Sequence, residues 1–207
     1  MSMIMGPNPV KLTEELMTGH LIKSGARVCD LGSGNGLTSL FLAKEYGFET
    51  TVPLNMATLD AKEEVRAMCA ANTCRAYGSN WSCPPACGTI AQCAEKMSQF
   101  TQGILVQTIG VREDSWDFEA AQEAAENHKE RFRQIALRLW KDGVKVLPLC
   151  AGSCPICEKC AYPEPCRFPD KALPPMEGYG IDVYNTTKPT ELKYINGQNT
   201  VTFFGIV

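Results

Sequence analysis

The chain has 207 residues, of which 44% are hydrophobic and 21% charged, and its formal net charge is -3 at pH 7. This composition describes a globular protein that can bury a core, not a disordered chain. Lysines and arginines are scattered and form no runs, so we expect no nucleic-acid partner, which would need a concentrated basic surface. We also expect a cytoplasmic protein with no membrane partner, because no stretch approaches the roughly 20 apolar residues that span a bilayer and the N-terminus does not read as a secretory signal.

About the first 52 residues follow one pattern. The sequence predicts an amphipathic helix over 11–24, a buried strand over 26–31, a helix over 37–47 and a strand over 48–52. A glycine-rich turn joins the first strand to the second helix, where glycines let the backbone approach a ligand at the helix N-terminus. The pattern predicts a short N-terminal Rossmann-like β-α unit.

The turn and its strand, VCDLGSGNG, resemble the first motif of class I S-adenosylmethionine-dependent methyltransferases. The resemblance implies that Asp30, Gly32, Gly34 and Gly36 would lie against the methionine and ribose parts of the cofactor. It stops near residue 52, and the later strands of that fold have no counterpart downstream. We therefore interpret residues 1–54 as a partial methyltransferase-like segment, and keep methyl transfer as an alternative function.

Residues 55–207 are expected to form a second, cysteine-rich domain. A helix is predicted over 60–72, with Asp60 as N-cap and Glu63 completing a capping box. Residues 77–88 must be irregular, because prolines and glycines interrupt them. A short helix over 89–100 and a strand over 103–111 follow.

The long helix predicted from residue 118 to residue 139 is the clearest element. Its apolar stripe steps by three and four residues and comprises Phe118, Ala121, Ala125, His128, Phe132, Ile135 and Leu139. A histidine in such a stripe indicates a core residue. A strand over 144–150 would complete a crossover between parallel strands, and Asn196-Gly197 predicts a hairpin between 192–195 and 200–207. The expected fold class is therefore α/β, with α+β as the alternative, built on a small sheet of mixed strand directions.

Eleven cysteines are the most informative feature, because clustered thiols in a reducing compartment indicate metal ligands or redox groups. With only two histidines in the chain, sulfur would have to supply almost all of the ligands. The run Cys154-x2-Cys157-x2-Cys160, followed by Cys166, is typical of ferredoxin-type cubane sites. We interpret these four residues as ligands of a 4Fe-4S cluster, with zinc or a metal-free redox role as alternatives.

A second group of cysteines precedes the long helix. Cys69, Cys74, Cys83 and Cys87 could bind a second metal or complete the first site from across the fold. The sequence leaves open whether Cys87, Cys93 and Cys150 are ligands. Buried structural thiols are the simpler interpretation of Cys93. Trp81 is interpreted as a packing residue that could also shield a metal from water.

Residues 57–207, with AMCAANTCRAYGSNWSCPPACGT and CPICEKCAYPEPCRFPDKALPPMEGYGIDV, resemble an uncharacterised prokaryotic family of predicted metal-binding proteins. The resemblance implies metal binding and no particular reaction. It places family cysteines at Cys69, Cys74, Cys83, Cys154, Cys157, Cys160 and Cys166.

The leading hypothesis is an iron-sulfur protein that carries electrons to a redox partner protein or supports a partner redox enzyme. A zinc-stabilised interaction module is the alternative without redox chemistry. Open strand edges in residues 1–52 would also allow a homodimer.

Overall fold

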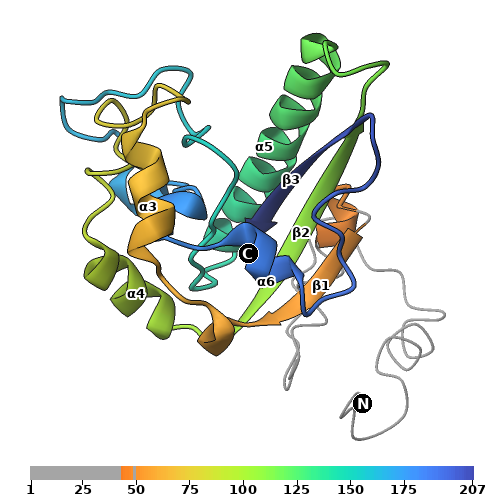
Figure 1. Ribbon diagram of the computed structural model, residues 1–207. Helices are drawn as coiled ribbons and strands as arrows, with labels where there is room; N and C mark the ends of the chain where they lie inside the picture. The colour runs from red at the N-terminus through yellow and green to blue at the C-terminus, as the bar shows by residue number, and fades with distance from the viewer. Residues whose placement is uncertain (1–42, 49) are drawn as a thin grey trace, which may run out of the picture.

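The structure is a computed structural model that describes residues 43–48 and 50–207, and it is built on one antiparallel sheet. The strands stand in the order β1 (Thr50–Asn55), β2 (Gln102–Val111) and β3 (Thr200–Ile206) (Figure 1). With its helices, this sheet confirms a fold of mixed α and β structure. The strand directions, however, are antiparallel in both ladders and not mixed.

The central strand β2 is an apolar run whose side chains alternate between two buried faces. Ile104 and Val106 belong to one hydrophobic cluster, whereas Leu105 belongs to the other. This alternation follows from the two-residue period of a strand. Because both faces are covered, the run is apolar without interruption from Ile104 to Val106.

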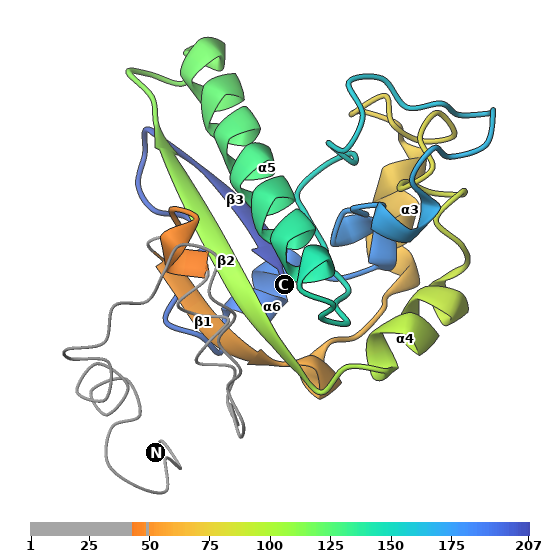
Figure 2. The same ribbon diagram turned by 180° about the vertical axis from the view of Figure 1, so that it is seen from behind.

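One face of the sheet is covered by the long helix α5 (Phe118–Lys141) (Figures 1 and 2). The Asp117 side chain accepts a hydrogen bond from the Ala120 N–H and starts the helix. Phe132, Ile135 and Leu139 are buried against β2, as the apolar stripe predicted. Phe118 is the exception at 68% exposure, because it stands at the helix start beside Trp116 and not over the sheet.

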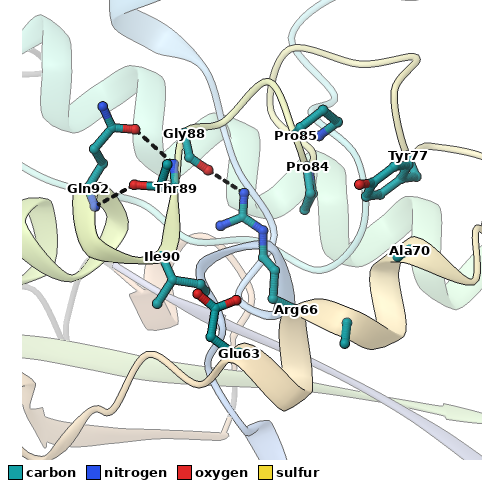
Figure 3. A pocket seen from close by; sticks show the side chains of 11 residues that line it. Glu63, Arg66, Ala70, Tyr77, Pro84, Pro85, Gly88, Thr89, Ile90 and Gln92 are labelled. Carbon is teal, nitrogen blue, oxygen red and sulfur yellow. Dashed lines mark hydrogen bonds between the residues drawn. The ribbon is translucent and has the colours of Figure 1, made fainter.

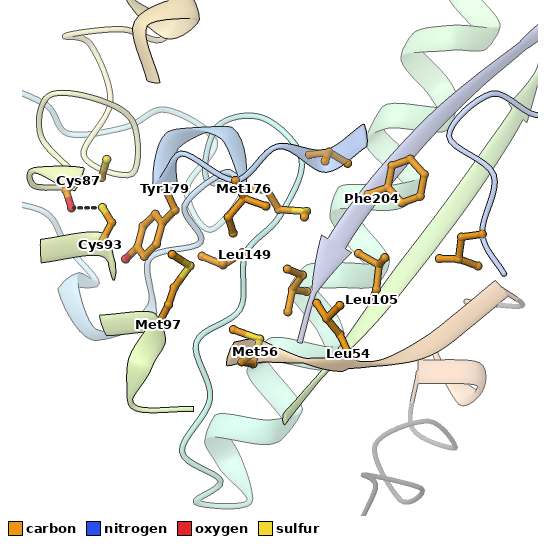
Figure 4. Close-up of a cluster of buried hydrophobic side chains, with 14 residues drawn as sticks. Leu54, Met56, Cys87, Cys93, Met97, Leu105, Leu149, Met176, Tyr179 and Phe204 are labelled. Atoms are coloured by element: carbon orange, nitrogen blue, oxygen red, sulfur yellow. Dashed lines mark hydrogen bonds between the residues drawn. The ribbon is translucent and has the colours of Figure 1, made fainter. Parts of the chain in front are cut away.

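The opposite face packs against short helices and the loops around them. Leu54, Leu105, Phe204 and Ile206 from the sheet join Met176 and Tyr179 in one buried cluster (Figure 4). The connections contain four short helices. Three are 3-10 helices, η1 (Met56–Thr58), η2 (Pro169–Lys171) and η3 (Glu177–Tyr179), and the fourth is the helix α6 (Val183–Thr187).

Helices α3 (Glu63–Ala70) and α4 (Ile90–Ser98) lie together beyond the end of the sheet (Figures 1 and 2). Thr89 and Gln92 form a reciprocal capping box that fixes the start of α4. The loop between α3 and α4 and the loop that follows Cys150 come together beside α3. Both cysteine groups are thereby brought to one end of the molecule.

Three predicted details are corrected. Asp60 does not cap α3: the N-cap is Lys62, without a side-chain hydrogen bond, because Ala61 pairs with Ile181 and the chain before the helix is extended. The strand predicted over 144–150 is reduced to two isolated bridges, an antiparallel one between Leu149 and Ile206 and a parallel one between Cys150 and Pro175. Since β3 also runs antiparallel to β2, this segment runs parallel to β2, with β3 between them.

The predicted hairpin at Asn196-Gly197 is likewise absent from the described residues. β3 forms as expected, but its ladder partner is β2 and residues 192–195 are not a strand. The Asn196 side chain instead donates to the Lys193 carbonyl oxygen at 2.9 Å and turns the chain.

Residues on either side of the predicted boundary at 54–55 share this fold. β1 runs from Thr50 to Asn55 and pairs with β2 along its whole length. Phe48 is fully buried, and the Arg131 guanidinium donates to the Gly47 carbonyl oxygen at 2.9 Å. Residues 1–42 of the predicted Rossmann-like unit lie outside the described residues, whereas its last strand, predicted over 48–52, overlaps β1. Among the helices that the structure describes, none combines the length and the apolar character needed to cross a membrane.

Candidate metal centre

Cys154, Cys157, Cys160 and Cys166 line one small cavity of about 20 Å³. Each of these cysteines is half-buried. The apolar side chains of Trp81, Ile156 and Phe168 form part of the wall. The four-cysteine run predicted from its spacing therefore surrounds one space.

The loop that carries this run is held from the other cysteine segment. Trp81 Nε1 donates to the Glu164 carbonyl oxygen at 2.8 Å, and the Trp81 and Tyr162 rings meet edge to face at 5.1 Å. Prolines at 155, 163 and 165 exclude helix from the loop. Trp81 therefore packs against the loop and also forms a wall of the cavity.

Backbone amides point at the first sulfur of the run. The Leu173 N–H donates to Cys154 Sγ at 3.4 Å. Burial raises the pKa of the Cys154 thiol, and the amides of Leu173 and Ile156 oppose that increase. Donors of this kind favour the thiolate, which is the form that binds metals.

A second and larger cavity of about 400 Å³ contains Cys69, Cys74 and Cys83, together with Lys129 and Glu177. Burial raises the pKa of the Cys69 thiol, and the nearby Glu177 carboxylate raises it further. Burial raises the pKa of Cys83 to about 11. These three thiols line one cavity, and a lysine and a carboxylate share their space.

The two cavities are lined by neighbouring residues of the same two segments, with Ser153 in the larger cavity and Cys154 in the smaller one. Ser82 lines the smaller cavity, and its neighbour Cys83 lines the larger one. The Cys154 N–H donates to Ser82 Oγ at 3.1 Å. The two cysteine groups are thus adjacent without merging into one site.

Cys87 lies apart from both cavities. It is buried, and its Sγ accepts a hydrogen bond of 3.3 Å from the Arg66 guanidinium. Cys93 is its neighbour in the core, as drawn in Figure 4. Cys150 is also buried, and burial raises its pKa to about 12. These thiols are structurally distinct from the seven that line the cavities.

The cysteine sulfurs of the described residues do not form a closed coordination shell for a metal ion in this structure. Within residues 43–48 and 50–207, no group of three or more Cys, His, Asp or Glu side chains converges closely enough to hold an ion. Four thiols around one cavity nevertheless have the chemistry that a sulfur-ligated metal requires. A metal would therefore have to draw these sulfur atoms together.

Some site features had no signal in the sequence. Lys129, Glu177 and Ser82 reach the cavities from separate elements, and nothing in their local sequence marks them. Asp30, Gly32, Gly34 and Gly36, proposed for S-adenosylmethionine, lie outside the described residues. His128 is a core residue as predicted, fully buried with Nδ1 2.8 Å from Thr108 Oγ1.

Comparison with known proteins gives one result. No curated protein and no solved structure matches the chain. The family model described as "Predicted metal-binding protein (DUF2284)" matches residues 53–207, and it gives no support to the methyltransferase resemblance, which lies before that range. The family name indicates metal binding without naming the metal. The match covers well over half of the sequence, so the chain belongs to the DUF2284 family of predicted metal-binding proteins.

Proposed function

We propose that the chain binds an iron-sulfur cluster of the 4Fe-4S type through Cys154, Cys157, Cys160 and Cys166. The cluster would serve electron transfer with a redox partner protein or support a partner redox enzyme. The observation that carries this proposal is that all four thiols of the ferredoxin-like run line one cavity. When bound, such a cluster supplies one-electron redox chemistry.

The surroundings of the run support this proposal. Amide donors at a cluster sulfur and apolar walls are the features that proteins use to tune cluster potential. Here the Leu173 amide faces Cys154 Sγ, and Trp81 and Phe168 contribute to the wall. The chain would therefore bind the cluster, orient its ligands and limit the access of water.

The volume of the cavity favours a second candidate. About 20 Å³ is close to the space that one water molecule occupies, which suits a single ion better than a cubane. A cubane needs more room than this, so the loop around Glu158 and Lys159, whose side chains are exposed, would have to rearrange around it. A structural zinc ion bound by the same four thiols is accordingly the alternative.

Metal analysis of protein purified without oxygen tests the proposal. Iron and acid-labile sulfide of about four each per chain, with broad absorption that bleaches on reduction, would support one cubane cluster. About eight of each would add a second cluster, for which Cys69, Cys74 and Cys83 supply the adjacent thiols. Stoichiometric zinc in a colourless protein would overturn the electron-transfer proposal and favour the structural zinc site.

A further inference from the structure

Cys87 and Cys93 share a single guanidinium. Arg66 Nη2 donates to Cys87 Sγ at 3.3 Å, and Nη1 donates to Cys93 Sγ at 3.7 Å. Arg66 also donates to the Gly88 carbonyl oxygen, as Figure 3 shows. Both sulfurs are buried, with Cys87 8% and Cys93 0% exposed. The two thiols therefore lie together on one side of the arginine.

The charge of Arg66 has no carboxylate partner among the residues that the structure describes. A half-buried cation needs a compensating charge or hydrogen bonds. Within the described part of the chain, the polar atoms bonded to this guanidinium are the two sulfurs and one carbonyl oxygen. The environment of Arg66 therefore favours an anion on one of the two sulfurs.

Cys93 is the better place for that anion. It lies in the first turn after the capped start of α4, where the helix dipole and Arg66 together favour a thiolate. The adjacent Cys87 thiol is the main cause that lowers the pKa of Cys93, to about 7, and the Arg66 guanidinium lowers it further. The same interaction raises the pKa of Cys87. The Cys87 thiol can donate its proton to the Gly178 carbonyl oxygen, which lies 3.6 Å from Cys87 Sγ.

A positive guanidinium at both sulfurs disfavours binding of a metal cation there. The nearby recess offers a different chemistry. It has a volume of about 510 Å³ and is lined by Arg66, by Gly88, which follows Cys87 in the chain, and by Glu63, Tyr77 and Gln92. Arg66 is thus shared between this recess and the two sulfurs, and access of a small molecule to the sulfurs would require its side chain to move aside.

We propose that Cys87 and Cys93 form a redox-active dithiol, which a small-molecule disulfide converts into an intramolecular disulfide. The Cys93 thiolate attacks one sulfur of the reagent, its S–S bond breaks, and one thiolate leaves and takes up a proton. Cys87 then loses its proton, attacks the Cys93 sulfur of the mixed disulfide and releases the second thiol. Two protein thiols are oxidised by two electrons, and one disulfide is reduced to two thiols.

The test uses the full chain with the metal content that it has when isolated. The protein is equilibrated in oxygen-free buffers that contain reduced and oxidised glutathione in varied ratios. After acid quenching and alkylation, peptide mapping follows Cys83, Cys87 and Cys93. We expect Cys87 and Cys93 to lose the alkyl label together as the buffer becomes oxidising, while Cys83 keeps it. Persistent labelling of both, separate glutathione adducts without a cross-link, or a cross-link to Cys83 would each overturn the proposal.

Substitutions test which residues the cross-link requires. Cys93→Ser should abolish the cross-link, and Cys150→Ser, which removes a buried thiol away from the pair, should leave it intact. Because a serine variant could fail to fold, Arg66→Gln supplies an independent readout. Loss of the guanidinium removes stabilisation from the reduced pair, so the equilibrium should shift toward the disulfide by roughly tenfold. An unchanged equilibrium in Arg66→Gln would contradict the role given to Arg66.

Discussion

Ser82 Oγ accepts a hydrogen bond of 3.1 Å from the Cys154 backbone N–H, so the loop after α3 is joined to the first cysteine of the ferredoxin-like run. The hydroxyl is in turn 2.8 Å from Asn80 Oδ1, to which it can donate. Ser82 is itself buried. A single hydroxyl therefore aligns two segments that are 72 residues apart in the sequence.

Ser82→Ala should destabilise the protein by about 1–3 kcal/mol, because it leaves the Cys154 N–H without its acceptor. Urea unfolding measures this change. The rate of metal release to a chelator should also rise, since the first ligand of the run is less well held. Ser79→Ala is the matched control, because Ser79 is exposed and bonds only the local Arg75 carbonyl. Equal effects of the two substitutions would contradict this prediction.

Cys154→Ser should abolish metal binding at the smaller cavity, because an alcohol is a poor substitute for a thiolate ligand. Cys150→Ser should retain the metal, since Cys150 is buried outside both cavities. Metal content per chain, measured on protein purified without oxygen, compares the two. Retention of metal by Cys154→Ser would exclude Cys154 as a ligand.

His128 should make folding stability depend on pH. Burial lowers its pKa in the folded protein to about 4, whereas the unfolded chain has a pKa of about 6.5. Between these values the unfolded state binds more protons, so stability is full above about pH 6.5 and falls as the pH approaches about 4. The shift corresponds to a loss of about 3 kcal/mol.

The measurement is the free energy of unfolding in urea across that pH range, with His128→Asn as the comparison. Asparagine can keep a hydrogen bond to Thr108, but it does not titrate. The difference between the two proteins should shrink as the pH falls, because the asparagine variant lacks this loss. Parallel pH profiles for both proteins would rule out His128 as the source.

Gly205→Ala tests the approach of α5 to the sheet. A methyl group at residue 205 would lie 2.5 Å from the Phe132 ring and 3.1 Å from the Leu149 carbonyl oxygen. We expect a destabilisation of about 1–3 kcal/mol from overpacking. The double variant with Phe132→Leu should recover part of this cost, which urea unfolding would show as non-additivity. Strict additivity would mean that the two side chains do not compete for space.

The elements best predicted from the sequence were those set by local patterning. β2 and α5 each carry a periodicity that matches the faces they bury. The strand expected over 144–150 did not form as such. Pro148 lacks an N–H to donate, and the segment makes only isolated bridges at Leu149 and Cys150.

The part of the candidate site that could be predicted from the sequence is the part set by local spacing. Short two-residue spacings and the following Cys166 kept the four-cysteine run on one loop, and that loop surrounds one cavity. The separation of Cys87 from Cys83 was not readable from their spacing. In the structure Cys83 lines the larger cavity, whereas the Cys87 sulfur accepts a hydrogen bond from Arg66 in α3.

The two ladders of the sheet also determine which contacts between the cysteine segments form late in folding. The β1–β2 ladder closes the segment that carries Cys69 to Cys93, and the β2–β3 ladder closes the segment that carries Cys150 to Cys166. Contacts between such distant strands form slowly during folding, because long loops must close before the contacts can stabilise them. The hydrogen bond between Ser82 and the Cys154 N–H, which joins these two segments, therefore forms late in folding, whereas the four cysteines of the run lie on one loop and are close in sequence from the start.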